Sequence, residues 1–202
     1  SSAASDVYKR QEGYWLLSER TNGQFASQAY HIEAMENGLR VVAPTSPVLS
    51  RGDTLNRPTI TIEFLAVSPE VISVRAWHYE GYRTGEARFE KKETTCGAVV
   101  TITENEAVLD AGRVSVHVDR KNWGYSFWAD GKLLTSSGFH NLGYVRWDKR
   151  VSSMLPQDNY MKEHEYTPYM TQDLLLAPGE NVYGFGERFT AFVKNGQAVE
   201  TW

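Results

Sequence analysis

The sequence contains a single cysteine, Cys96, among its 202 residues. One cysteine cannot form an intrachain disulfide or a zinc site made of cysteines alone, so we expect stability to come from a hydrophobic core. Basic residues are also in the minority, because 21 Lys and Arg stand against 25 Asp and Glu, a formal charge of −4. A nucleic-acid-binding protein would present a basic face, and this composition argues against that class.

Long hydrophobic segments and targeting signals are missing as well. No apolar run approaches the roughly 18 residues that span a bilayer, and no secretory signal occurs at the start of the sequence. None of the nine asparagines lies in a glycosylation sequon, and an unpaired thiol is unusual in secreted chains. These absences predict a soluble, cytoplasmic protein that has no membrane partner.

The two ends of the sequence are not typical of domain ends. Residues 1–11 are small and polar, and we interpret them as a non-native leader, which leaves residues 12–202 for one domain. The last residue, Trp202, is apolar and follows no capping signal or polar tail. We therefore expect the domain to be truncated within a longer protein. The length excludes a sandwich together with a (β/α)₈ barrel, since the barrel alone takes about 250 residues.

Helical periodicity is scarce, whereas alternation of apolar and polar residues recurs along the chain. Residues 59–64 place Ile60, Ile62 and Phe64 on one face, with Thr59, Thr61 and Glu63 on the other. Residues 113–119 repeat the pattern with three valines and place His117 on the polar, solvent-facing side. Alternation of this kind is typical of half-buried antiparallel strands.

Turn residues separate these strands at short intervals. Asp130-Gly131 predicts a two-residue hairpin, because both positions of a type I′ turn need a positive φ, and Asn37-Gly38 predicts a second hairpin. The polar, Pro-containing residues 154–171 are expected to form a loop or edge strands. Short strands about every ten residues indicate an all-β fold, an antiparallel β-sandwich.

Motifs that carry chemistry are absent or incomplete. The five histidines show no metal-ligand spacing, so we expect no metal site. Gly184-Phe185-Gly186 begins like a dinucleotide-binding loop, but Phe189 occupies the third glycine position. We interpret this segment as a tight stretch in which the glycines allow close backbone approach. The sequence predicts neither a cofactor nor a catalytic residue.

Aromatic residues cluster in the second half of the chain. Trp123, Tyr125 and Phe127 share one face of a strand, which favours a place in the core. The alternative is a sugar-stacking platform made of Trp123, Trp128 and Trp147. That alternative would make the chain a non-catalytic carbohydrate-binding module.

Three motifs lie near the C-terminus: Tyr-Gly-Phe-Gly-Glu-Arg-Phe at residues 183–189, Lys-Asn-Gly-Gln at residues 194–197 and Glu-Thr-Trp at residues 200–202. In this order they resemble family 31 glycoside hydrolases, and most of all their bacterial α-xylosidase branch. Upstream, residues 51–56 (Arg-Gly-Asp-Thr-Leu-Asn) and the strand that follows also match, and residues 13–16 are similar to the opening strand of the family. The resemblance covers about residues 12–202.

The resemblance implies that the chain is the N-terminal, galactose mutarotase-like β-sandwich of a retaining enzyme that removes terminal α-xylosyl residues from oligosaccharides. In this family the aspartate nucleophile and the aspartate acid/base lie on the (β/α)₈ barrel that follows. No residue here matches them, so the chain alone is expected to be inactive. An α-glucosidase on the same scaffold is left open, as is assembly of identical copies.

The resemblance also assigns supporting roles to residues near the C-terminus. Trp202 would immediately precede a loop that reaches the active site and contacts the oligosaccharide substrate. The expected interface with the enzyme's own catalytic barrel consists of Phe185, Glu187, Arg188, Phe189 and Phe192. For Glu187 and Arg188, a solvated surface pair is an equally good interpretation.

Overall fold

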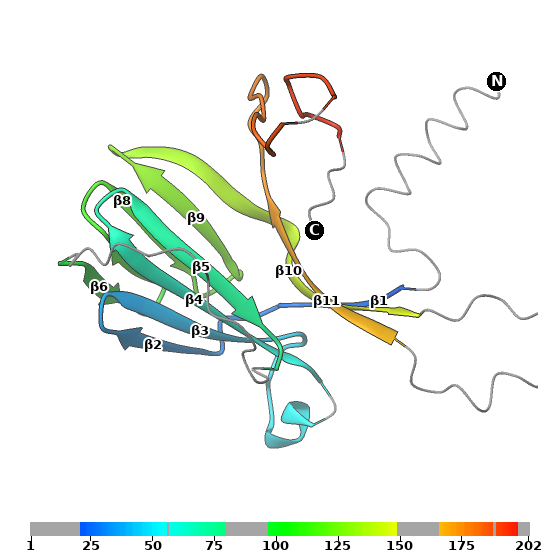
Figure 1. The fold of residues 1–202 in the computed structure, drawn as a ribbon. Coiled ribbons are helices and arrows are strands. Elements are labelled where there is room, and N and C mark those ends of the chain that lie inside the picture. Colours follow the sequence, from blue (N-terminus) through cyan, green and yellow to red (C-terminus); the bar gives the residue numbers. More distant parts are fainter. Residues whose placement is uncertain (1–20, 56, 80–96, 149–165, 188, 198–202) are drawn as a thin grey trace, which may run out of the picture.

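The structure, a computed structural model, describes residues 21–55, 57–79, 97–148, 166–187 and 189–197. Within these ranges the strands pair antiparallel and form two stacked sheets (Figure 1). The predicted all-β sandwich is therefore confirmed. The described helical structure is one short 3₁₀ turn, η1 (Arg51–Thr54). None of the described segments forms a helix long and apolar enough to cross a membrane.

The two sheets differ in size. The larger sheet has seven strands in the order β1-β10-β9-β8-β7-β6, with β11 also paired to β10. Its strands are β1 (Thr21–Phe25), β6 (Val99–Ile102), β7 (Glu106–Asp110), β8 (Val114–Asp119), β9 (Gly124–Ala129), β10 (Lys132–Asp148) and β11 (Tyr166–Leu174). The smaller sheet has the order β2-β3-β4-β5 and consists of β2 (His31–Met35), β3 (Gly38–Pro44), β4 (Thr59–Ser68) and β5 (Val71–Trp77).

The core lies between the sheets and follows the predicted alternation. Ile60, Ile62 and Phe64 of β4 are completely buried, as are Val116 and Val118 of β8. Burying an apolar side chain of this size contributes about 1.5–3 kcal/mol relative to leaving it exposed. Because successive strand residues point to opposite faces, the residues between these positions face outward.

Aromatic contacts join the two sheets across the core. The ring of Phe64 packs edge-on against Tyr125 at 5.4 Å and against Phe127 at 6.2 Å between ring centroids. Trp123 is also buried, in the turn that precedes β9, and its indole N–H donates to the Asn141 side-chain oxygen at 2.9 Å. The core interpretation of these three aromatic residues is confirmed.

The outer face of the smaller sheet carries a row of alternating charges. Glu33, Arg40, Glu63 and Arg75 are register partners across β2, β3, β4 and β5. Arg40 Nη2 and Nε donate to Glu63 Oε1 at 2.7 and 2.8 Å, and Arg75 Nη1 lies 3.9 Å from Glu63 Oε2. Opposite charges at directly paired positions stabilise a sheet. These contacts leave the whole of Glu63 only 5% exposed.

The 17-residue strand β10 changes partners along its length. Residues 132–136 pair with β9, whereas residues 143–147 pair with β1. His140 lies between these parts with φ at 59°, and its ring stacks on Phe25 at 4.0 Å. Beyond this irregularity β1, β10 and β11 form a ribbon that extends to one side of the two stacked sheets (Figure 1). For the predicted loop or edge segment, residues 166–171 are confirmed as strand, and residues 154–165 lie outside the described residues.

Both predicted hairpins form, with one difference in detail. Asp130 and Gly131 connect β9 to β10 with φ angles of 50° and 72°, as a type I′ turn requires. In the other hairpin the turn consists of Glu36 and Asn37, and Gly38 is already the first residue of β3. A Cβ atom on Gly38 would lie 2.5 Å from the Leu65 side chain, so close strand approach explains this glycine better than the turn does.

A polar contact fastens the two sheets together at one end. The Pro69 carbonyl, in the turn between β4 and β5, accepts backbone hydrogen bonds from Arg113 at 2.9 Å and Val114 at 3.0 Å. The Arg113 side chain pairs with Glu70 at 2.8 Å and with Asp130 at 3.4 Å. This contact fixes the position of the smaller sheet relative to β8 and β9.

Candidate functional site

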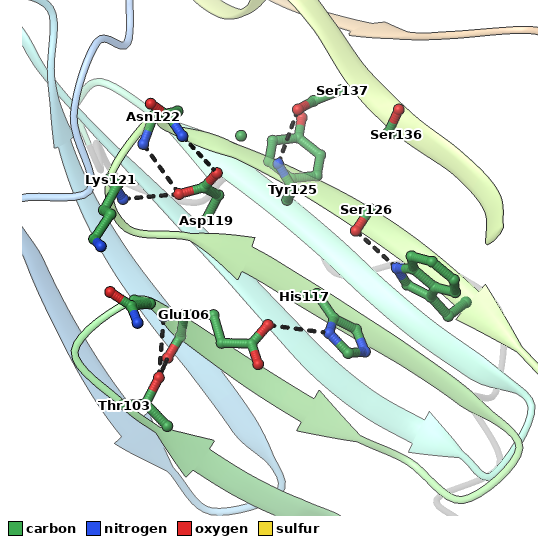
Figure 2. A pocket seen from close by; sticks show the side chains of 13 residues that line it. Thr103, Glu106, His117, Asp119, Lys121, Asn122, Tyr125, Ser126, Ser136 and Ser137 are labelled. Carbon is green, nitrogen blue, oxygen red and sulfur yellow. Dashed lines mark hydrogen bonds and ion pairs between the residues drawn. The ribbon is translucent and has the colours of Figure 1, made fainter. Parts of the chain in front are cut away.

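A polar groove of about 600 Å³ lies on the outer face of the larger sheet (Figure 2). Val116, Val118, Tyr125 and Phe127 point into the core, so the residues that alternate with them point outward. Strands β7, β8 and β9 run side by side here, and their outward side chains form the floor. The residues that carry the argument are Glu106, His117, Asp119, Lys121, Ser126 and Trp128, and we call this site the outer groove.

A histidine and a carboxylate meet on the floor of the groove. His117 Nδ1 lies 3.5 Å from Glu106 Oε2, and His117 Nε2 lies 3.2 Å from Ser115 Oγ (Figure 2 shows the Glu106 contact). His117 faces outward as predicted, but its side chain is only 35% exposed. The ring is held on both of its nitrogen atoms, which fixes its orientation within the groove.

One end of the groove is formed by a rigid turn. Asp119 Oδ1 accepts hydrogen bonds from the backbone N–H groups of Lys121 at 2.8 Å and Asn122 at 3.0 Å, and Oδ2 accepts from the Asn122 amide at 3.2 Å (Figure 2). The hydrogen bond from the Asn122 backbone is the main cause of a lowered pKa of Asp119, which partial burial opposes. Asp119 is therefore a fixed negative charge at neutral pH.

An aromatic side chain contributes apolar surface to the polar groove. The Trp128 indole N–H donates to Ser126 Oγ at 2.8 Å, and the indole ring lies 5.7 Å from the His117 ring at a tilt of 51°. Trp128 is half-buried and also lines a second hollow next to the first, beside Asp110, Arg113 and Asp130. The ring is thus held in place while part of its surface stays accessible.

The chemistry of the outer groove suits a neutral, polar ligand. Hydroxyl groups, carboxylates, an amide and an ammonium group offer both donors and acceptors along one surface. In the part of the chain that the structure describes, no three His, Cys, Asp or Glu side chains lie together as a metal ion would require. The groove has the size of a small-molecule site, since such sites enclose roughly 300–1,000 Å³.

A second feature, which we call the aromatic surface, lies in the C-terminal segment after β11. It consists of Tyr183, Phe185, Phe189 and Phe192, which are 52%, 51%, 109% and 79% exposed. The Tyr183 and Phe192 rings lie 5.0 Å apart. Several exposed aromatic side chains on one short segment are typical of a protein interface.

Two polar side chains hold this segment in shape. Lys194 is 7% exposed, and its Nζ donates to Thr190 Oγ1 and to the Ala191 carbonyl, both at 2.6 Å. Asn195 accepts from the Val182 N–H at 2.7 Å and donates to the Glu180 carbonyl at 2.8 Å. These contacts give Lys194 and Asn195 of the Lys-Asn-Gly-Gln motif a structural role in the segment that carries the aromatic residues. Sequence reasoning noted the motif but not this role.

The Gly-Phe-Gly segment is shaped by its backbone angles. Gly184, Phe185 and Gly186 have φ angles of 106°, 65° and 75°. Among the described residues, no atom lies within 4 Å of a Cβ built on either glycine, so the predicted close approach is wrong. A left-handed conformation at a bulky residue costs roughly 1–2 kcal/mol. The segment bears this strain while keeping the Phe185 ring exposed.

The structure describes four of the five predicted interface residues. Phe185, Phe189 and Phe192 are all exposed on the one short segment, and Glu187 beside them is exposed too. Arg188 lies outside the described residues, as does Trp202. The interface role of all five residues and the role of Trp202 stay predictions.

The predicted stacking platform is wrong in at least one of its three members. Trp123 is only 9% exposed and its indole is hydrogen-bonded to buried Asn141, so it cannot offer a face to a sugar. The Trp147 side chain lies outside what the structure describes. Trp128 does lie at the surface, in the outer groove. The outer groove was not predicted from the sequence. The one feature of the sequence that points to it is the polar residues that alternate with core residues on β8 and β9.

The sequence is similar to one known family of domains and to two known α-xylosidases. Residues 60–202 match the family described as the glycosyl hydrolase 31 N-terminal galactose mutarotase-like domain. The α-xylosidase XylQ of Lactiplantibacillus pentosus is 31% identical over 193 residues, and an α-xylosidase of Emericella nidulans is 27% identical over 200 residues. These alignments cover 94% and 95% of this chain but only 23% and 25% of the relatives, so the chain spans about a quarter of their length.

A solved structure shows the same fold at low sequence identity. The crystal structure of the uncharacterized protein lmo2446 from Listeria monocytogenes superposes with a TM-score of 0.58 at 14% identity. The match covers 88% of this chain and 14% of that one. At this identity the likeness concerns the fold alone.

Proposed function

Because the chain belongs to the N-terminal galactose mutarotase-like domains of glycosyl hydrolase family 31, we propose that it is the N-terminal domain of an α-xylosidase. The single observation that carries the substrate class is the 31% identity to an α-xylosidase along almost the whole chain. A second α-xylosidase, from a fungus, aligns over a similar range. The proposed parent enzyme removes terminal α-xylosyl residues from oligosaccharides in the cytoplasm.

In this proposal the chain supports catalysis without performing it. Retaining hydrolysis needs two carboxyl groups about 5–5.5 Å apart, one as nucleophile and one as acid/base. We place both groups on a (β/α)₈ barrel that follows this domain, at the carboxyl ends of its strands, where such barrels carry their active sites. Trp202 then leads into a loop that reaches the bound sugar.

The aromatic surface is the proposed contact with that barrel. Phe185, Phe189 and Phe192 expose apolar rings that an interface would bury. Glu187 and Arg188 are its proposed polar members. The bonds of Lys194 and Asn195 hold the segment in its shape before the barrel binds. Such preorganisation lowers the entropy cost of forming the interface.

Substrate profiling of the complete enzyme tests the proposal. The kcat/KM for p-nitrophenyl α-xyloside is expected to exceed that for the matching α-glucoside. The glucoside carries an additional hydroxymethyl group, which a pocket fitted to xylose excludes. A preference for the glucoside would instead support an α-glucosidase built on the same scaffold, and failure to cleave either substrate would overturn both assignments.

A further inference from the structure

We propose that the outer groove is an accessory binding site for neutral oligosaccharides, separate from the active site of the parent enzyme. The inference rests on the proposed function for the choice of sugar and for the accessory role. The groove and its chemistry belong to the described residues of this chain. The role would be to hold an oligosaccharide on the sandwich, which raises its effective concentration near the catalytic domain.

The distribution of charge in the groove selects a ligand without strong charge. Glu106 and Asp119 contribute two carboxylates, and Lys121 contributes one ammonium group. A phosphorylated or otherwise anionic ligand would meet an excess of negative charge, and the Asp119 carboxylate is held ionised by its hydrogen bonds. A polyhydroxylated neutral molecule is favoured, because each hydroxyl group both donates and accepts hydrogen bonds.

The aromatic side chain adds the apolar contact that a sugar ring needs. The C–H groups on one face of a pyranose carry a small positive charge, and they pack against the electron-rich face of an indole. The hydrogen bond to Ser126 and the contact with His117 hold Trp128 in place, so little side-chain entropy is lost on binding. Trp128 is therefore the expected main contact, with Glu106 and Lys121 as polar partners.

The groove also lies next to the segment that leads to the aromatic surface. Ser136 lines the groove, and its carbonyl accepts a hydrogen bond from the Leu175 N–H at 2.8 Å. The neighbouring Thr135 hydroxyl donates to the Leu175 carbonyl at 2.8 Å. A saccharide in the groove would thus lie beside the chain segment that runs toward the proposed barrel interface. This placement supports a binding site that acts together with the catalytic domain.

Binding to the purified 202-residue chain is the test, with xyloglucan oligosaccharides and maltotriose as separate probes. Titration calorimetry and tryptophan fluorescence are expected to show binding at millimolar sugar or below. The Trp128→Ala variant should bind about 3–10-fold more weakly, which corresponds to the loss of one aromatic contact. Trp77→Ala, a tryptophan on the smaller sheet, is the matched control and should bind as the wild type does.

A second variant keeps the test decisive if Trp128→Ala fails to fold. Glu106→Gln retains the size of the side chain and removes its charge, and it should also weaken binding while circular dichroism stays unchanged. No binding by the wild-type chain, or wild-type affinity in folded Trp128→Ala, would overturn the proposal. Binding of maltotriose alone would support the groove as a saccharide site and overturn xyloglucan oligosaccharides as its ligand.

In the complete enzyme the same variant separates this site from the active site. Trp128→Ala is expected to raise KM for a xyloglucan oligosaccharide by about threefold or more while kcat is kept. Hydrolysis of p-nitrophenyl α-xyloside should not change, because this small substrate has no sugar units to reach the groove. Equal losses on both substrates would overturn the accessory role and indicate a structural one.

Discussion

Glu63 of β4 is a buried carboxylate on the outer face of the smaller sheet. It is buried because two arginines from the neighbouring strands lie over it, Arg40 from β3 and Arg75 from β5. The position of these arginines over Glu63 depends on which strands become neighbours and in what register.

Removal of the Glu63 carboxylate should destabilise the smaller sheet. In Glu63→Ala two guanidinium groups face each other across an empty position, and we expect the free energy of unfolding to fall by about 1–3 kcal/mol. Urea denaturation measures this loss. Glu33→Ala is the control, since its side chain is 53% exposed at the sheet edge, and the expected loss is below about 0.5 kcal/mol. Equal losses would contradict the role given to burial.

Ionisation of Tyr125 in the core lowers the free energy of unfolding at high pH. Among the described residues, no group meets its buried hydroxyl with good hydrogen-bond geometry. Burial raises the pKa of Tyr125 from 10.0 to about 12, although the polar side chain of Gln172 nearby offsets part of the increase. The unfolded chain ionises this group at the lower pKa. Stability from this tyrosine is therefore intact below about pH 10 and is lost as the pH rises toward 12.

The resulting prediction concerns the difference between two proteins. From about pH 9 to about pH 12 the wild type should lose roughly 2–3 kcal/mol more than Tyr125→Phe, which has no group to ionise at this position. Chemical denaturation at a series of pH values measures both curves. Parallel curves would mean that Tyr125 ionises equally easily in the folded and unfolded chain.

At the scale of elements, hairpins were predictable and long-range pairings were not. Asp130 and Gly131 adopt positive φ angles that few other residues tolerate, so these two residues alone predict the turn. The change of partner along β10 depends on β1, which is more than 100 residues earlier in the chain, and no local signal announces it. The outer groove was missed for the same reason. Its floor needs β7, β8 and β9 side by side.

The turn between β9 and β10 offers a direct test at this scale. Gly131 has φ at 72°, so Gly131→Ala places a side chain in the left-handed region at a cost of about 1–2 kcal/mol. Gly52→Ala is the matched control, because the φ of Gly52 lies outside the left-handed region and, among the described residues, the nearest atom to a Cβ there is Ser50 Oγ at 3.8 Å. Thermal unfolding should show a lower midpoint for the first variant and little change for the second.

The whole molecule has two surfaces of different character. The outer groove is polar, with one half-buried tryptophan, while the aromatic surface after β11 is apolar and highly exposed. The Tyr-Gly-Phe-Gly-Glu-Arg-Phe motif pointed to the second surface because its residues are consecutive. We therefore propose different roles for the two surfaces. The aromatic surface contacts the catalytic domain, and the outer groove binds an oligosaccharide at an accessory site.

The most direct test of the central claim compares two purified proteins on p-nitrophenyl α-xyloside. One is the 202-residue chain, and the other is the longer protein that we propose, in which a catalytic barrel follows this domain. We expect the longer protein to release p-nitrophenol and the chain to release none above background, because in our proposal this domain only supports the barrel. Turnover by the chain alone would contradict the account, because the catalytic carboxylates would then lie within these 202 residues.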